Sequence, residues 1–156
     1  MNESQIIIRH AELADLDKIL EIENSSFSDP WSESKFLSHF NSKIGVTLVA
    51  LVNDEICGYV NAYIIAGDEN GEYGEFEIAN IAVSPEHRRM HIGDKLIEVV
   101  SDIASKERCT KAFLEVRESN HPAQRLYLKN GFVVTGIRKN YYSNPRENAI
   151  LMMREI

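Results

Sequence analysis

The sequence has few cysteines that could form disulfide bonds and no long apolar run that could span a membrane. Its 156 residues include two cysteines, Cys57 and Cys109, and neither forms a CxxC pair or sits in a recognisable nucleophile motif. We therefore expect reduced thiols in a cytoplasmic protein. No apolar run approaches the roughly 20 residues of a membrane span. The N-terminus shows no signal-peptide pattern, so no membrane partner is expected.

An excess of positive charge is also missing. The 17 basic and 24 acidic residues give a formal net charge of −7. This balance argues against nonspecific binding to nucleic acid, which needs a dominant basic face. It is compatible with a cationic partner such as a basic peptide. The length suits one domain over residues 1–156, and the 44% hydrophobic composition is ordinary for a globular protein.

Apolar periodicity predicts strands and helices along the whole chain. Strands are expected over residues 5–9, 46–52, 55–66, 75–83, 111–117, 132–138 and 148–154. Helices are expected over 13–20, around 36–40, and over 94–106 and 121–130, with a break at 25–32 and a loop at 139–147. The order strand, helix, strand between 75 and 117 implies a right-handed crossover and a parallel pair. The predicted fold class is mixed α/β, with one largely antiparallel sheet, a central parallel strand pair and helices on both faces.

The most informative segment is Ile81–Gly93, with the sequence IAVSPEHRRMHIG. An apolar strand runs through a proline-containing turn into a basic loop, and the loop opens an amphipathic helix. Backbone N–H groups at a helix start lack intrahelical partners and carry the positive end of the dipole. Arg88 and Arg89 beside them can grip phosphate oxygens. From the residues alone, a site for a phosphorylated cofactor and a solvated basic turn that caps a helix are equally open interpretations.

The segment resembles the acetyl-CoA signature of the GNAT acetyltransferases, Q/R-x-x-G-x-G/A. Arg88 occupies its first position and Gly93 its last, while His91 stands where glycine is usual. Further segments resemble, in the right order, the bacterial ribosomal-protein-alanine N-acetyltransferases. They are FSDPWS at 27–32, IANIAV at 78–83, FLEVRESN at 113–120, LYLKNGF at 126–132 and IRKNYY at 137–142.

This resemblance implies the GNAT fold and acetyl-CoA as co-substrate, without a metal. It implies transfer of the acetyl group to a protein N-terminus, most specifically the alanine of a small-subunit ribosomal protein. Two alternatives stay open: a GNAT enzyme for other protein N-termini, lysine or a small amine, and a non-catalytic CoA-binding module. His91 favours the non-catalytic module, whereas the presence of Glu115, Asn120 and Tyr127 together argues against it.

Glu115 is the first candidate for the general base. It lies late in its predicted strand, on the face opposite Leu114. Taken alone, it is better interpreted as a surface carboxylate paired with Arg117, but the resemblance implies that it accepts the proton of the acceptor amine. The resemblance also makes Glu77, in the strand before the basic loop, the second candidate, since many GNAT enzymes place a base there. Tyr127 has the spacing of a core aromatic residue, and the resemblance gives it the role of general acid.

The other expected contacts also follow from the resemblance. Acetyl-CoA contacts are expected from Ile81, Ala82, Val83, Arg88, Arg89, Met90, His91, Ile92, Gly93, Asp94, Asn120 and Tyr127. Substrate contacts are expected from Phe27, Pro30, Trp31, Tyr141 and Tyr142. The aromatic residues can alternatively form a satellite core cluster, and Asn120 can simply cap a helix. His87 and His91 are four residues apart but lack a third ligand at a usual spacing, so no metal site is expected.

Overall fold

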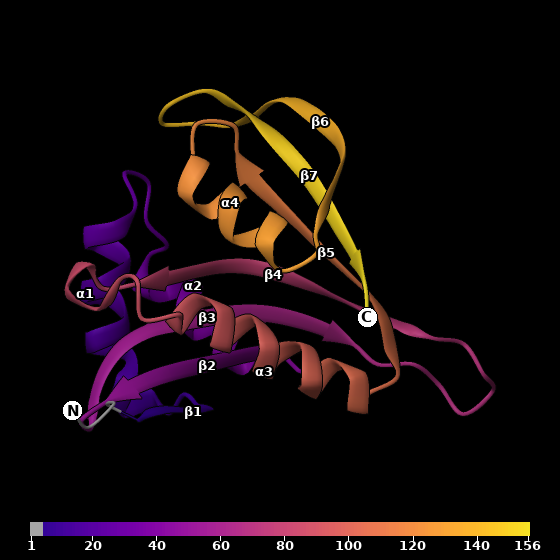
Figure 1. Cartoon of the computed structure of the whole chain (residues 1–156), viewed down its shortest axis with the longest axis horizontal. Coiled ribbons are helices and arrows are strands. Elements are labelled where there is room, and N and C mark those ends of the chain that lie inside the picture. Colours follow the sequence, from indigo (N-terminus) through magenta and orange to yellow (C-terminus); the bar gives the residue numbers. More distant parts are fainter. Residues whose placement is uncertain (1–4) are drawn as a thin grey trace. The chain divides into compact units, whose positions relative to one another are not determined.

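A computed structural model describes residues 5–156 of the chain (Figure 1). Its strands are β1 (Ile6–His10), β2 (Gly45–Val52), β3 (Glu55–Ile65), β4 (Gly74–Val83), β5 (Cys109–Arg117), β6 (Val133–Tyr142) and β7 (Glu147–Glu155). Its helices are α1 (Leu16–Ser26), α2 (Glu33–Asn41), α3 (Ile92–Lys106) and α4 (His121–Lys129), with 3-10 turns at Leu13–Asp15 and Pro85–His87.

Hydrogen bonding joins the strands into a seven-stranded sheet in the order β1-β2-β3-β4-β5-β7-β6. The β4–β5 pair is parallel, while β1–β2, β5–β7 and β6–β7 are antiparallel. The predicted mixed sheet with a central parallel pair is therefore confirmed. The contacts within the chain group into two compact units. The N-terminal unit comprises the residues up to Ala62 and Asn80–Val100, and the C-terminal unit comprises Tyr63–Ala79 and Ser101–Ile156. The single domain expected over residues 1–156 stays a prediction.

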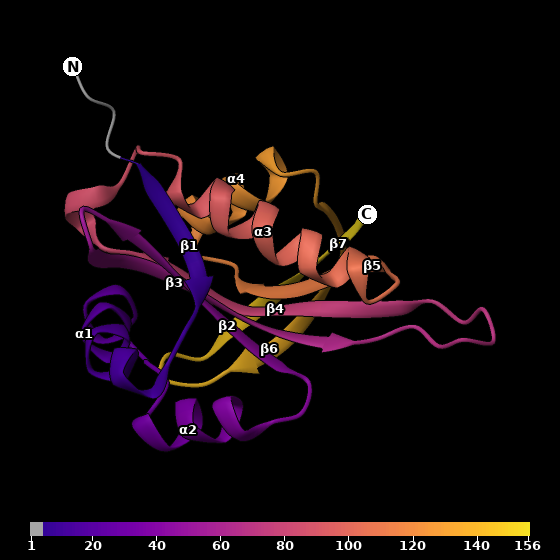
Figure 2. The same cartoon turned by 90° about the horizontal axis from the view of Figure 1, so that it is seen from below.

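In the N-terminal unit, helices cover both faces of the β2–β3 hairpin, as expected (Figure 2). On one face α1 and α2 pack a buried apolar cluster against Tyr59 of β3. The cluster comprises Leu16, Ile19, Ile22, Phe36, Val49, Tyr59 and Ala82. On the other face, Gly58 gives room to α3, because a Cβ there would lie 3.3 Å from a methyl of Ile92. Helix α2 begins at Glu33 because the Ser32 hydroxyl accepts a hydrogen bond from Lys35 N at 3.1 Å.

In the C-terminal unit, β5 lies between β4 and β7, with Glu77 opposite Phe113 and Glu115 opposite Leu151. The loop expected at 139–147 is wrong at its start, because β6 continues to Tyr142. The register shifts between Arg138 and Tyr142. Asn140, with φ +53°, lies inside this irregular stretch, which extends the pairing to Tyr142 opposite Glu147. The break expected at 25–32 is also shortened, because α1 extends through Ser26.

Candidate active site

The basic loop after β4 leads directly into the first turn of α3, a helix of 15 residues. The side chains of Arg88 and Arg89 are exposed, as anion-binding groups must be. Arg89 and His91 have φ values of +66° and +61°, so position 91 needs the left-handed conformation that glycine adopts most easily. The His91 ring lies 3.1 Å from the Asp94 carboxylate. Exposed guanidinium groups at a helix N-terminus suit the pyrophosphate of a CoA thioester.

The residues expected to contact acetyl-CoA fall into two groups along the chain. Residues 81–83 end β4, residues 88–91 form the loop and residues 92–94 open α3, all in the N-terminal unit. Asn120 and Tyr127 belong to α4 and its cap in the C-terminal unit. The capping interpretation of Asn120 is confirmed, because its Oδ1 accepts a hydrogen bond from Ala123 N at 3.2 Å. The cofactor contacts themselves stay predictions.

Two carboxylates, Glu77 and Glu115, line one pocket of about 340 Å³ in the C-terminal unit. The rest of its lining comes from Phe113, Leu114, Thr135, Arg138, Leu151 and Met152. The Glu115 side chain is 23% exposed, and its Oε1 lies 3.4 Å from Nη1 of Arg138. Partial burial and the nearby charge of Glu115 raise the pKa of Glu77. The proposed pairing of Glu115 with Arg117 is wrong, since Arg117 pairs with Glu147 at 3.1 Å.

Tyr141 and Tyr142, at the end of β6, are associated with the same carboxylates. A hydrogen bond with Glu115 raises the pKa of Tyr141, and Arg138 lies 5.0 Å from the centre of its ring. The two tyrosine rings meet edge to face at 5.0 Å. Burial, followed by the charge of Glu115, raises the pKa of Tyr142 to about 12. Both tyrosine hydroxyl groups therefore stay protonated at neutral pH.

Tyr127 is a buried residue of α4, only 5% exposed. Its ring packs edge to face against Phe132 at 5.8 Å, so the core-aromatic interpretation describes its packing. Burial raises the pKa of its hydroxyl, with a smaller contribution from Tyr142. A phenol that holds its proton this firmly can donate a hydrogen bond throughout the physiological pH range. The role of general acid stays a prediction.

The aromatic residues of the α1–α2 loop pack against the protein itself. Phe27 and Trp31 lie against the core cluster of the N-terminal unit. The Trp31 ring contacts Phe36 at 5.2 Å and His39 at 5.7 Å, and the Lys35 ammonium lies 4.4 Å from its centre. These contacts are those of a satellite core cluster. A substrate role for the loop, including Pro30, stays a prediction.

Sequence reasoning missed a buried polar network centred on Glu23 of α1, a residue that is 1% exposed. Its carboxylate accepts hydrogen bonds from the Tyr59 hydroxyl, from Trp31 N at 3.0 Å and from Asn80 Nδ2 at 3.1 and 3.0 Å. The network continues from Asn80 to Asn61. Burial raises the pKa of Glu23 to about 7. The available signal was the two asparagines inside apolar strands, because a buried amide needs partners.

Three further observations concern the thiols, metal binding and possible membrane spans of the described residues. Cys57 and Cys109 are buried free thiols, and burial raises the pKa of both, which makes them poor nucleophiles. Within residues 5–156, no three His, Cys, Asp or Glu side chains are grouped so that they could hold a metal ion. None of the helices described is long and apolar enough to cross a membrane.

Comparison with known proteins defines the class. Residues 16–132 match the model of the Acetyltransferase (GNAT) family. The chain therefore belongs to the GNAT family of acetyltransferases, and acetyl-CoA is its acetyl donor.

The names of similar proteins specify the acceptor of the acetyl group more narrowly than the family name does. A Bacillus subtilis protein whose name proposes it as a ribosomal protein bS18-alanine N-acetyltransferase is 36% identical over 93% of this chain and 92% of its own length. An N-alpha-acetyltransferase of Sulfurisphaera tokodaii is 33% identical over 93% of this chain and 90% of its own. The crystal structure of the Escherichia coli ribosomal-protein-S18-alanine N-acetyltransferase superimposes with a TM-score of 0.83 at 30% identity, covering 97% of this chain and 94% of the other.

Proposed function

We propose that the protein acetylates the N-terminal α-amine of a protein, and that its acceptor is the N-terminal alanine of a small-subunit ribosomal protein. The observation that carries this proposal is the pocket shared by Glu77 and Glu115, the second of which also raises the pKa of Tyr141. The names of the relatives support the choice of acceptor, since several act on the alanine of ribosomal protein bS18 and others are N-alpha-acetyltransferases.

Acyl transfer needs a neutral amine, and this requirement favours an N-terminus over a lysine. An α-amino group has a pKa of about 7.7–8.0 and a lysine about 10.4, so at pH 7 roughly a tenth of the former but under a thousandth of the latter is neutral. A carboxylate is therefore a sufficient base for an α-amine, directly or through water. Glu115 is proposed as this base. Its Oε1 faces Arg138, and it shares the pocket with Glu77.

The leaving thiolate needs a hydrogen-bond donor. Bound acetyl-CoA supplies the thioester, and Tyr127 is proposed to donate its hydroxyl proton in a hydrogen bond to the developing charge on sulfur. Full proton transfer from an ordinary phenol to a thiolate is uphill by roughly 2 kcal/mol. The raised pKa of Tyr127 makes transfer harder still, so hydrogen bonding is the favoured role. Backbone groups of Ile81 and Val83, at the end of β4, are proposed to hold the acetyl carbonyl.

A pair of peptides tests the proposal. One begins with a free alanine and carries arginine in place of every lysine. The other has the same length and charge, a blocked N-terminus and one free lysine. Mass spectrometry of reactions with acetyl-CoA should show rapid acetylation of the first peptide and much slower acetylation of the second. Equal rates would contradict an α-amine acceptor. A series that varies only the first residue then tests the preference for alanine.

A further inference from the structure

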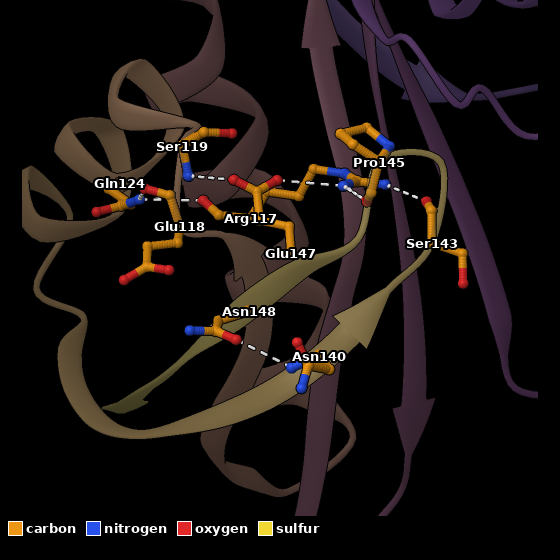
Figure 3. Close-up of polar contacts among 9 residues, drawn as sticks. All are labelled: Arg117, Glu118, Ser119, Gln124, Asn140, Ser143, Pro145, Glu147 and Asn148. Carbon is orange, nitrogen blue, oxygen red and sulfur yellow. Dashed lines mark hydrogen bonds and ion pairs between the residues drawn. The ribbon is translucent and has the colours of Figure 1, made fainter.

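Arg117 ends β5, two residues beyond Glu115, so the two side chains leave the strand on the same face. The guanidinium of Arg117 turns toward the tip of the β6–β7 hairpin (Figure 3). Its Nη2 donates a hydrogen bond to Ser143 O at 3.0 Å, and its Nη1 donates to Pro145 O at 2.9 Å. The guanidinium of Arg117, here called the fork, thus donates to two backbone carbonyls of the hairpin tip. The tip comprises residues 143–146, which are exposed.

The same guanidinium also pairs with Glu147, the first residue of β7. Nη1 of Arg117 lies 3.1 Å from Glu147 Oε1, and the two side chains are only 20% and 14% exposed. The second carboxylate oxygen of Glu147 accepts a hydrogen bond from Ser119 N at 2.8 Å. The pair therefore fastens the hairpin tip to the segment between β5 and α4, just before the Asn120 cap of the helix that carries Tyr127.

The arrangement fixes an aromatic side chain as well as the backbone. The Arg117 guanidinium lies 4.4 Å from the centre of the Tyr142 ring, a cation–π contact at a half-buried site. Tyr142 in turn packs against Tyr141, whose pKa is raised by Glu115. Arg117 thus contacts Tyr142 directly and is linked to Tyr141 through it. A lysine could keep the charge but could not reach two carbonyls and a carboxylate in one plane.

We propose that Arg117, together with Glu147, is a positioning residue for the acceptor: it holds the β6–β7 hairpin so that Tyr141 and Tyr142 border the pocket of Glu115. This inference rests on the proposed function, since it assigns the hairpin to binding of the acceptor N-terminus. It concerns acceptor binding and not acetyl-CoA binding. Loss of the fork should therefore raise the KM for the peptide while changing the KM for acetyl-CoA little.

The test compares Arg117→Lys with a matched control, Arg9→Lys. Arg9 of β1 also holds a carboxylate with both nitrogens, at 2.7 and 3.0 Å from Asp15, and it donates to a backbone carbonyl. Steady-state kinetics are measured with the alanine peptide and acetyl-CoA each varied. Arg117→Lys should raise the peptide KM about tenfold or more, because charged hydrogen bonds in a fixed geometry are lost. Arg9→Lys should leave both KM values within about twofold of the parent, since Arg9 lies far in the sequence from the proposed site and its contacts are with Asp15 and the backbone.

A second variant and a second measurement distinguish loss of the proposed positioning from a general loss of stability. Glu147→Gln keeps one acceptor oxygen, so its peptide KM should fall between those of the parent and Arg117→Lys. Amide hydrogen exchange of residues 139–146 should be faster in Arg117→Lys than in the parent and unchanged in Arg9→Lys.

Two results would overturn the inference: a peptide KM for Arg117→Lys no higher than that of Arg9→Lys, or unchanged exchange in the hairpin. A parent that acetylates no peptide N-terminus would instead contradict the proposed function and, with it, the acceptor role of Arg117. The exchange experiment would still report whether the fork holds the tip.

Discussion

Asn80 of β4 donates hydrogen bonds to both carboxylate oxygens of Glu23 on α1, at 3.1 and 3.0 Å. Glu23 also accepts a hydrogen bond from Trp31 N in the α1–α2 loop. One buried carboxylate therefore links the loop expected to contact substrate with the strand residue that precedes Ile81. Each tie is a hydrogen bond to a group that has no access to water as an alternative, so each is costly to leave unmade.

Glu23 should make stability fall with rising pH. Its pKa is about 7 in the fold and 4.5 as the ordinary value. The contribution of Glu23 to the free energy of unfolding is fully present below pH 4.5 and is lost as the pH rises through 7. The reason is that this carboxyl group ionises at a lower pH in the unfolded chain than in the fold. The shift corresponds to at most about 3 kcal/mol. Urea unfolding at pH 5, 6.5 and 8 should show the parent losing stability relative to Glu23→Gln. Parallel pH profiles for the two proteins would refute the assignment.

Tyr127→Phe should lower kcat about 10- to 100-fold with little change in either KM, because the hydroxyl is proposed to bond the sulfur only as charge develops there. The ring contact with Phe132 is kept, so the melting temperature should move little. Since burial raises the pKa of Tyr127, the variant should keep every inflection of the parent's pH–rate profile up to about pH 10. A raised KM with an unchanged kcat would show that the hydroxyl serves binding instead.

His91→Gly should fold at least as well as the parent. A left-handed φ in a residue other than glycine carries a strain of about 1–2 kcal/mol, and this offsets the greater entropy that glycine gives the unfolded chain. The variant also loses the contact with Asp94. His91 adds a side chain where the motif usually has glycine, so its removal should leave acetyl-CoA binding as tight as in the parent or tighter. Calorimetric titration of both proteins with acetyl-CoA measures this. A large loss of affinity in the variant would make His91 a structural requirement of the loop.

The sequence predicted the order of the elements well, because alternating apolar residues and polar turns are local signals. The strands expected over 46–52 and 55–66 are separated by two residues, Asn53 and Asp54. These have φ values of +52° and +64°, in residue types that tolerate a tight turn. The end of β6 was misjudged because a polar stretch containing Asn140 has the composition of a loop. Only the pairing with β7 shows that the strand continues to Tyr142.

The sequence predicted where single candidate residues lie in their own strands, but not which residues from other strands they contact. The strand placed Glu115 on the correct face, but its partner Arg138 comes from β6, and strand order is not a local property. Arg117 was taken as that partner because it is near in sequence, whereas it reaches across to β7. Glu23 was missed because its burial depends on Tyr59 and Asn80, which lie 36 and 57 residues further along the chain.

The proposed base is tested most directly by kcat/KM for the alanine peptide, measured from pH 6 to pH 9 in Glu115→Gln and Glu77→Gln. The two residues share one pocket, so each variant is the control for the other. Glu115→Gln should lose about 10²–10⁴-fold in kcat/KM, with acetyl-CoA binding nearly intact, and Glu77→Gln should lose much less. A full rate in Glu115→Gln with a large loss in Glu77→Gln would contradict the assignment of Glu115 as the residue that accepts the proton.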